Sequence, residues 1–502
     1  MTDQPPDVPE RQEYEGLYNP LVAHRARFLD PSKSVQRAGE NPFNTTVYVV
    51  DSLLVNATPD AQATQDFVDF AASLGIDVTR DPDNVALLDR GRRLDLGDSL
   101  DEGWVTPVKL TLLPQAPPTT LDAWTLLQAW RHREELADEA RNVVGLDHLM
   151  YATIGGTTMT LGGTMTLGGT MTLGGTMTLG GTMTLGGGVR VQYVVPGLGG
   201  RTPVAYVGAP PRRARELRHR RPVVAIPDTG VGQHPWLADG VRRDPPPNAE
   251  PERTGIIHAP LEGPLDDFSG HGTFIAGLIR QTCPNADLRA VRVMGSDGFV
   301  EEAQMVNAIT TLWLDHAEKD TIDVLSMSFG YYHEAPEDLR TDASILGPLT
   351  QLRRLGVTLV ASAGNDATTR PMFPAAFSRR IDLVSVGANN PNGTRTLFSN
   401  SGSWVRTYDT GAALLSTQPT TFNGALQPSA RLQNPEGVTR ESIDLDDFTG
   451  GFATWSGTSF AAPVVAGKIA QHLIDLRDQQ AGFDALGDPD EAVRAVLDEL
   501  ES

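Results

Sequence analysis

Three side chains able to carry out nucleophilic catalysis stand in distinctive segments of this sequence. Asp228 follows the apolar run 222–227, His271 lies between two glycines, and Ser459 lies in a stretch of small residues ending at Pro463. A serine hydroxyl is a weak nucleophile near neutral pH and needs an adjacent base. A histidine can serve as that base when a carboxylate orients it. The three residue types therefore supply a nucleophile, a general base and an orienting acid.

The segment around the serine predicts the start of a helix. Pro463 would fall in the first turn, where the missing N–H of proline costs nothing, and apolar residues continue to Leu473. The free N–H groups and the dipole at a helix N-terminus favour negative charge. A serine alkoxide, or the oxyanion that it creates, needs that environment.

Four segments resemble the motifs of the subtilisin-like serine peptidases, the subtilase family, and they follow the order of that family. They are Asp228-Thr-Gly, Gly-His271-Gly-Thr, the apolar strand that ends at Asn365, and Gly-Thr-Ser459-Phe-Ala-Ala-Pro. The resemblance implies a triad of Asp228, His271 and Ser459, with Asn365 in the oxyanion hole. Each residue alone has an ordinary structural explanation, such as a strand end, a core histidine or a helix cap. The four together are far more specific.

The resemblance also implies where a substrate binds. One segment would pair with an extended peptide by strand addition, and a second would line the pocket for the residue before the cut. These candidate substrate-binding residues are Ser328, Phe329, Gly330, Ser362, Ala363 and Gly364. Met372 lies where the family often has glycine at the pocket floor, which suggests a shallower pocket. The implied activity is a serine endopeptidase that hydrolyses protein or peptide substrates through an acyl-enzyme.

Short apolar strands alternate with helices from residue 221 to the C-terminus. Apolar strands separated by helices are typical of a mostly parallel sheet with helices on both faces, so we expect an α/β catalytic domain at 221–502. The expected helices are 272–281, 301–319, 343–355, 459–480 and 489–500. The candidate site would lie at the carboxyl edge of the sheet.

The first 220 residues predict four further segments. We expect a disordered segment at 1–40, a small α+β domain at 41–150, a repeat linker at 151–188, and connecting strands with a basic segment at 189–220. Within 41–150 the pattern predicts strands at 45–55 and 105–113 and helices from 58 and over 120–144, with 85–96 either irregular or containing a short strand. Inhibitory prodomains of many subtilases share this element order. A family-specific accessory domain is an equal alternative.

The linker contains the hexapeptide Gly-Gly-Thr-Met-Thr-Leu four times without change, over 162–185. Such a period is compatible with stacked coils of a β-solenoid. However, two glycines in each repeat cost backbone entropy, and identical copies do not look like tuned packing. We therefore favour a flexible linker over a solenoid.

Charge and composition narrow the possible partners. The net charge of −22 argues against nucleic acid, because phosphate binding needs a basic surface. The single cysteine, Cys283, rules out an internal disulfide and is expected to be buried. The first residues lack a secretory pattern, and no apolar run approaches the ~20 residues that span a bilayer, so we expect a cytoplasmic protein without membrane contact. No cofactor is required and no metal site is predicted, although calcium is common in the family.

Two alternatives stay open at this stage. The acidic insertion 418–452 is either a lid or exosite near the cleft or a surface loop. The chain as a whole is either an active endopeptidase or a regulated, silent peptidase-fold protein that a partner or processing activates through the N-terminal domain.

Overall fold

The computed structural model describes most of the chain. The described residues are 20–35, 43–114, 120–153, 170–172, 176–178, 201–206, 208–244, 250–255, 265–335, 344–424, 428, 430–479 and 487–501. The expected strand at the start of 189–220 and most of the repeat lie outside these residues.

A seven-stranded parallel sheet forms the centre of the larger domain. Its spatial order is β10 (Val241–Asp244), β11 (Asp287–Arg292), β9 (Val223–Asp228), β13 (Val324–Met327), β15 (Thr358–Ser362), β16 (Leu383–Asn389) and β17 (Thr407–Thr410). Every neighbouring pair in it is parallel. The central strands are buried throughout, because helices cover both faces. The expected α/β class is confirmed.

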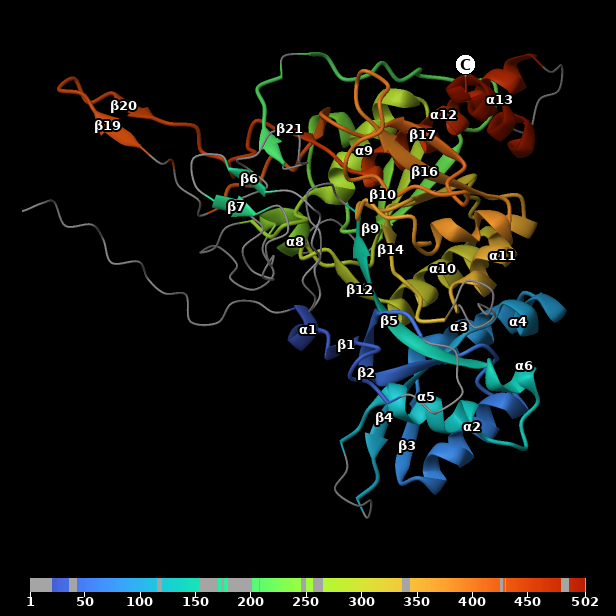
Figure 1. Cartoon of the computed structure of the whole chain (residues 1–502). Helices are drawn as coiled ribbons and strands as arrows, with labels where there is room; N and C mark the ends of the chain where they lie inside the picture. Colours follow the sequence, from blue (N-terminus) through green and yellow to red (C-terminus); the bar gives the residue numbers. More distant parts are fainter. Residues whose placement is uncertain are drawn as a thin grey trace, which may run out of the picture.

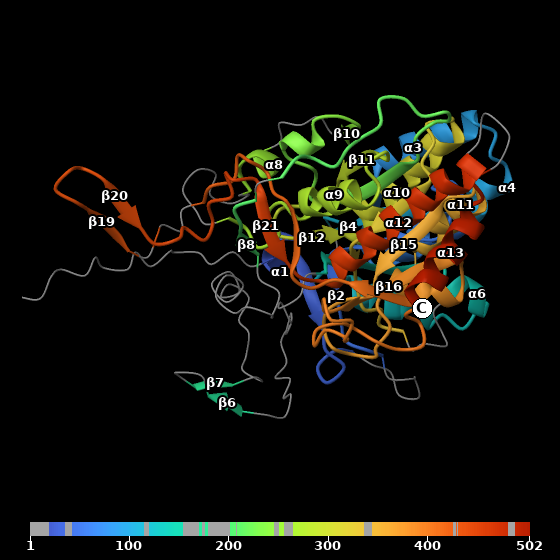
Figure 2. The ribbon, with the colours of Figure 1, turned by 90° about the horizontal axis from the view of Figure 1, so that it is seen from above.

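Helices lie above and below this sheet in Figure 1. On one side α9 (His271–Thr282) packs against α12 (Thr458–Gln479), and α13 (Pro489–Glu501) packs on α12. On the other side α10 (Glu302–Ala317) packs against α11 (Leu346–Arg354). The view from above in Figure 2 shows the strands running beneath α9 and α12. All five helices fall within a few residues of the predicted ranges.

Smaller elements surround this core. They are α8 (Glu250–Thr254), the 3₁₀ turns η1 (Pro235–Leu237) and η2 (Ala375–Arg379), and a three-stranded sheet of β18 (Leu414–Thr417), β21 (Phe452–Trp455) and β8 (Thr202–Pro203). β8 is all that the structure describes of the strand expected before the basic segment.

The N-terminal domain, at the lower end of Figure 1, is a small α+β unit. Its antiparallel strands are β1 (Ala26–Leu29), β2 (Thr46–Val55), β3 (Ile76–Arg80), β4 (Thr106–Leu112) and β5 (Val144–Ala152). The helices α2 (Gln62–Ser73) and α5 (Ala123–Arg131) enclose a separate core with these strands, which includes Phe67, Trp124 and Trp130. The expected α+β unit is present.

Three local predictions in this region were wrong. The helix expected over 120–144 ends at Arg131, and after the short α6 (Asp138–Arg141) the chain enters β5. The stretch expected to be irregular is α3 (Pro82–Arg93), which Asp81 caps by accepting the N–H of Asp83. Part of the segment expected to be disordered forms α1 (Pro20–Ala23) and β1, because β1 completes the edge of the sheet beside β2.

The two domains share an interface on α10 and α11. Arg90 of α3 pairs with Asp315 and Glu318 of α10. Trp104, just after α4 (Asp98–Gly103), lies with its ring centroid 6.5 Å from that of Trp313. Apolar side chains of both domains belong to one continuous cluster of buried residues. The N-terminal domain is therefore packed on the catalytic domain rather than tethered beside it.

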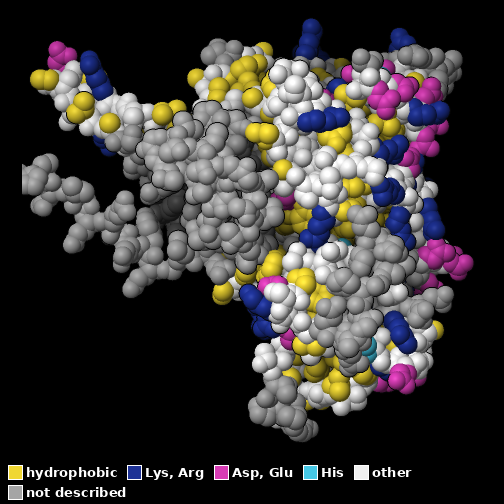
Figure 3. All heavy atoms as spheres, in the orientation of Figure 1, with side chains coloured by type: hydrophobic (Ala, Val, Ile, Leu, Met, Phe, Trp, Pro, Cys, Tyr) yellow, Lys and Arg dark blue, Asp and Glu magenta, His cyan; other side chains and the backbone are white. Residues whose placement is uncertain are grey.

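Two β-hairpins lie outside the sheets of these domains. β6 (Thr170–Thr172) and β7 (Thr176–Thr178) of successive repeats pair antiparallel. β19 (Arg431–Gln433) and β20 (Thr439–Glu441), within the insertion 418–452, form a hairpin that stands away from the body, with hydrophobic side chains visible on it in Figure 3. Among the described residues, no helix is both long and apolar enough to cross a membrane.

Candidate active site

The four residues of the subtilase-like motifs lie on different elements. Asp228 is the last residue of β9, His271 is the first residue of α9, and Ser459 is the second residue of α12. Asn365 follows β15 by three residues. All four are buried at the ends of strands or the starts of helices, where parallel sheets carry their sites.

The imidazole of His271 is held by Asp228. Its Nδ1 lies 2.8 Å from Oδ1 and 3.0 Å from Oδ2 of that carboxylate. The backbone around it is tightly packed, since a methyl group added to Gly272 would lie 2.3 Å from the carbonyl oxygen of Gly230. A glycine after the histidine is therefore needed for the helix to start this close to the aspartate strand. The carboxylate fixes the tautomer in which Nε2 carries the lone pair.

The hydroxyl of Ser459 lies in a polar environment at the start of α12. Its Oγ is 2.7 Å from Thr153 Oγ1 and 3.1 Å from the carbonyl oxygen of Ser328. The N–H of Ser459 donates to the carbonyl oxygen of Thr153 at 3.1 Å. In this state the serine is bound to a segment from the N-terminal domain.

Two buried polar atoms of the site have no hydrogen-bond partner among the described residues. They are Nε2 of His271 and Nδ2 of Asn365. The other amide atom of Asn365, Oδ1, accepts the N–H of Thr458 at 2.9 Å, which fixes the amide beside the helix start. An unpaired polar atom in a buried site is costly and needs an explanation. A proton acceptor and an oxyanion donor that are used only during reaction would provide one.

The end of β5 lies between two strands of the catalytic domain. β12 (Phe299–Glu301) pairs antiparallel with residues 149–151, and β14 (Phe329–Gly330) pairs antiparallel with residues 151–152. Figure 1 shows β5 rising from the N-terminal domain to reach these strands. An extended peptide held on both sides by catalytic-domain strands has the geometry of strand addition.

Thr153 continues this pairing to Ser459. Its N–H donates to the carbonyl oxygen of Ser328 at 3.2 Å, and the preceding N–H, of Ala152, donates to Gly298 at 2.9 Å. Its side-chain oxygen lies 2.6 Å from Ser362 Oγ. The carbonyl of Thr153 is thus presented to the serine as a substrate carbonyl would be.

The structure brings most of the candidate substrate-binding residues to this segment. Ser328 accepts the N–H of Thr153, Phe329 pairs with Ala152, and Gly330 pairs with Tyr151. From the second segment, Ser362 contacts Thr153.

The other two residues of that second segment make different contacts. The polar groups of Ala363 bind Val386 and Asn400, and the N–H of Gly364 donates to Thr458. Gly364 borders Met372, which is fully buried.

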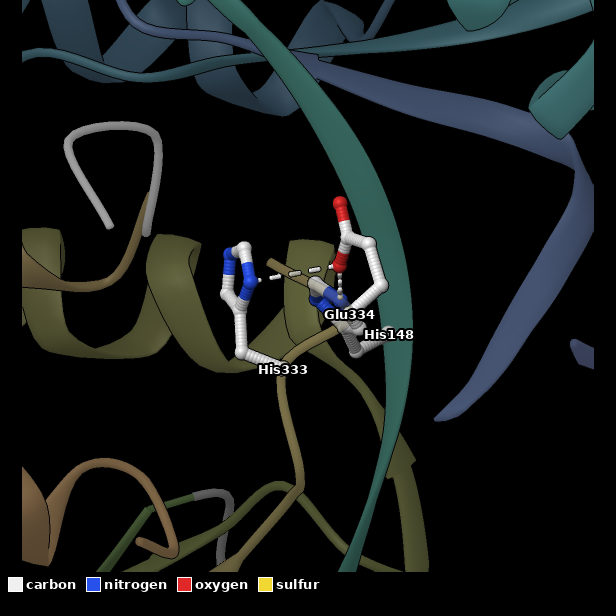
Figure 4. Close-up of side chains that lie close together, drawn as sticks. All are labelled: His148, His333 and Glu334. Carbon is white, nitrogen blue, oxygen red and sulfur yellow. Dashed lines mark hydrogen bonds and ion pairs between the residues drawn. The ribbon is translucent and has the colours of Figure 1, made fainter. Parts of the chain in front are cut away.

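A second buried polar cluster lies where β5 crosses the domain interface (Figure 4). His148 Nδ1 is 2.6 Å from Glu302 Oε2, and His148 Nε2 is 2.8 Å from Glu334 Oε2. His333 Nδ1 lies 3.3 Å from the same Glu334 oxygen. Burial opposes a charge on His148, but the hydrogen bonds to the two carboxylates outweigh it and raise its pKa to about 10. An imidazolium therefore links the N-terminal domain to two glutamates of the catalytic domain.

This cluster contains residue types that can bind a metal ion. His148, His333 and Glu334 offer ligand atoms within 4.8 Å of one another. However, both ring nitrogens of His148 face carboxylate oxygens that can only accept, and Nδ1 of His333 already accepts the N–H of Ala335 at 3.0 Å. A ring that donates from both nitrogens has no lone pair for a metal. The arrangement fits an ion-pair network better than a metal centre.

The sequence interpretation missed the N-terminal half of the site. Neither β5, nor Thr153, nor β12 was singled out, and His148 was not considered. The only signal was the short run Leu149-Met-Tyr-Ala152 followed by a small polar residue. That run reads as a strand only when its partners are known, because those partners belong to another domain.

Comparison with known proteins gives a consistent result. A family model described as the subtilase family matches residues 219–490. The chain is 27% identical over 276 residues to subtilisin BL of Lederbergia lenta, covering 53% of this chain and 81% of that protein. It is also 27% identical over 213 residues to an intracellular serine protease of Paenibacillus polymyxa, covering 41% of this chain and 53% of that protein.

An alkaline protease of Alkalihalobacillus alcalophilus is 27% identical to the chain over 276 residues, which cover 53% of this chain and 58% of that protein. The match thus spans less than two thirds of several relatives. Among solved structures, a lanthipeptide protease matches at 20% identity and a TM-score of 0.38, over 55% of this chain and 78% of that one. A cold-adapted subtilisin-like serine proteinase matches at 21% identity and a TM-score of 0.34, over 55% and 83%.

Proposed function

The chain belongs to the subtilase family and is a serine endopeptidase, and we propose that it cuts peptide bonds with Asp228, His271 and Ser459 as its catalytic triad. The Asp228–His271 pair, the position of Ser459 at a helix start and the unpaired Nε2 of His271 support this assignment. The reaction is attack of Ser459 Oγ on a peptide carbonyl, followed by hydrolysis of the acyl-enzyme.

The proposed reaction moves one proton between Ser459, His271 and the leaving amine. Ser459 Oγ leaves its hydrogen bonds to Thr153 and Ser328, and its proton passes to Nε2 of His271 as the C–O bond forms. His271 then gives that proton to the leaving amine as the peptide C–N bond breaks. Asp228 stays ionised and stabilises the imidazolium. A water molecule repeats the sequence in reverse and regenerates the serine.

The oxyanion is stabilised by two donors. We assign these to the N–H of Ser459, which already binds the Thr153 carbonyl, and to Nδ2 of Asn365, which has no other partner among the described residues. Both donors are held before the reaction begins, so no reorganisation is needed when charge develops. The dipole of α12 acts in the same direction.

The strongest support for the proposal is the hydrogen bond from the Ser459 N–H to the Thr153 carbonyl oxygen. The N-terminal domain places its own chain across the cleft, antiparallel to β12 and β14. We therefore propose that residues 41–150, extended to Thr153, act as an intramolecular inhibitor rather than as an unrelated accessory domain. A partner that binds this domain would act by withdrawing β5. A permanently silent binding protein is not favoured, because every group needed for catalysis is present.

We infer from the same geometry that the first substrate is the bond between Thr153 and Ile154. Ser459 would attack the Thr153 carbonyl carbon, release the amine of Ile154 and leave the N-terminal domain bound as a product. No organic cofactor takes part in this chemistry. The cytoplasmic location stays a prediction of the sequence, which shows no diagnostic calcium ligands.

The experiment compares the wild-type chain with Ser459→Ala. We expect the wild type to produce a fragment that begins at Ile154 and to hydrolyse casein, and we expect the variant to do neither. Phe460→Met is a matched control, because it changes a neighbouring side chain of similar volume and should keep both activities. Casein hydrolysis that persists in Ser459→Ala would refute the triad. An intact wild-type chain that nevertheless digests casein would refute the inhibitor role alone.

A further inference from the structure

Met372 lies against both of the segments that contact Thr153, at Gly330 and at Gly364. The Met372 side chain is fully buried between the two segments that line the cleft. A methyl group added to Gly330 would lie 2.8 Å from Met372 Cε, and one added to Gly364 would lie 2.3 Å from Met372 Sδ. The thioether therefore occupies the space between the two glycines. A large side chain from the residue before the cut has no room there unless Met372 moves.

Thr153 shows what the remaining space accepts. Its side chain is almost completely buried, at 2% exposure. The hydroxyl is satisfied by Ser362 Oγ at 2.6 Å and Ser459 Oγ at 2.7 Å. Replacing that hydroxyl with a methyl group, as in valine, would leave the buried Ser362 hydroxyl without this partner. A site that hydrogen-bonds a substrate hydroxyl discriminates against the analogue that lacks it.

The residues before Thr153 extend the pattern. Ala152 is buried beside Phe329 and leaves little room for a longer side chain. Met150 is fully buried opposite Val300 and belongs to the core shared by the two domains. The cleft thus holds an apolar residue, a half-buried tyrosine whose hydroxyl lies 3.4 Å from Asp366 Oδ2, a small residue and threonine.

We propose that this cleft selects substrates cut after threonine, with a small residue one position earlier and an apolar residue three positions earlier. The inference rests on the proposed function and adds its substrate class. The chain also contains the peptide Leu-Gly-Gly-Thr-Met, which fits this pattern, four times, with the threonines at 164, 170, 176 and 182. In each the threonine carbonyl would pass to Ser459 Oγ, and the methionine amine would leave with the proton from His271. The repeat is then a series of self-processing sequences between the two domains.

The test uses three quenched fluorescent peptides that differ at one residue: Leu-Gly-Gly-Thr-Met-Thr and its versions with valine or phenylalanine in place of the first threonine. The wild-type chain is incubated until self-processing is complete and is then assayed on each peptide. We expect kcat/KM for the threonine peptide to exceed that for the valine peptide by at least about tenfold, and that for the phenylalanine peptide by more. Mass spectrometry should place the cut after the first threonine.

Two variants separate the causes of this selectivity. Met372→Gly should raise kcat/KM for the phenylalanine peptide at least tenfold relative to kcat/KM for the threonine peptide. Ser362→Ala should remove most of the difference between threonine and valine. Equal cleavage of the phenylalanine and threonine peptides by the wild type would overturn the inference, as would a cut after methionine or leucine.

Labelling of the same samples by a fluorophosphonate probe distinguishes the two possible failures. If Ser459 is labelled but the threonine peptide is not preferred, this inference is wrong and the proposed function stands. If Ser459 is not labelled and no peptide is cut, the proposed function itself is wrong.

Discussion

Removing the charge of His148 should release the N-terminal domain from the cleft. The perturbation is His148→Leu in a Ser459→Ala chain, which cannot cut itself. Both ring nitrogens of His148 bind carboxylates, of Glu302 and Glu334, and all three side chains are buried. The leucine would leave two glutamates facing each other without the cation between them.

The expected magnitude follows from this burial. Breaking a buried ion pair by deleting one partner costs about 3–5 kcal/mol, because the remaining charge is uncompensated. At about 1.4 kcal/mol for each factor of ten, opening of β5 should become about 10²- to 3 × 10³-fold more frequent. Arg131, 3.6 Å from Glu334, offsets part of this cost, so we expect the lower half of that range.

Hydrogen exchange measured by mass spectrometry reads this opening directly. The N–H groups of Ala152 and Thr153 donate to Gly298 and Ser328, so they exchange only when the strand leaves the cleft. We expect their exchange to accelerate by the factor given above, while amides paired between β3 and β4 keep their protection. His132→Leu, the same substitution elsewhere in the domain, should change neither.

A triple variant separates lost charge from lost volume. His148→Leu combined with Glu302→Gln and Glu334→Gln removes the uncompensated charges and should recover much of the protection. The reasoning is refuted if His148→Leu changes the exchange of Ala152 and Thr153 by less than threefold. It is also refuted if β3 and β4 lose protection to the same extent, since the substitution would then act by unfolding the domain.

Three other predictions follow. The pKa of His148 is about 10 in the docked state and about 6.5 when free, so the stability that His148 gives to docking of β5 is full below pH 6.5 and is lost as pH rises through 10. Opening of β5, corrected for intrinsic exchange, should therefore increase by up to about tenfold per pH unit between pH 7 and 9. Burial raises the pKa of Asp147 to about 7, so opening of β5 should also increase as pH rises from 4 to 7. Asn365→Ala should lower kcat on a threonine peptide about 10²- to 10³-fold with an unchanged thermal transition, as loss of one such donor does in a subtilisin; a loss below tenfold would contradict its role. Burial raises the pKa of Cys283 to about 11 and its side chain is inaccessible, so iodoacetamide should leave it unmodified at pH 8 until the chain is unfolded.

The catalytic domain was predictable because its signals are local. The apolar run that begins at residue 222 forms a buried strand that ends at Asp228, and Ser459 and Pro463 mark the start of a helix. Each of these candidate residues could therefore be assigned to the end of an element from its neighbours alone. Their convergence at one edge then follows from the parallel sheet.

The occupied cleft was not predictable in this way. Residues 144–152 are buried on nearly every side, by β2 in their own domain and by β12 and β14 in the other, so the alternation that marks a half-exposed strand is absent. The two ion pairs of His148 are formed with residues that lie 154 and 186 positions further along the chain. Neither pattern can be read from a short window of sequence.

The nucleophile can be identified most directly by mapping a fluorophosphonate adduct by mass spectrometry, at pH 9, where opening of β5 is expected to be more frequent than at neutral pH. The account predicts one adduct, on Ser459, in the wild-type chain and a reduction of at least a hundredfold in the labelling rate of His271→Ala. An adduct on a different residue, or labelling of Ser459 that is unaffected by His271→Ala, would contradict it.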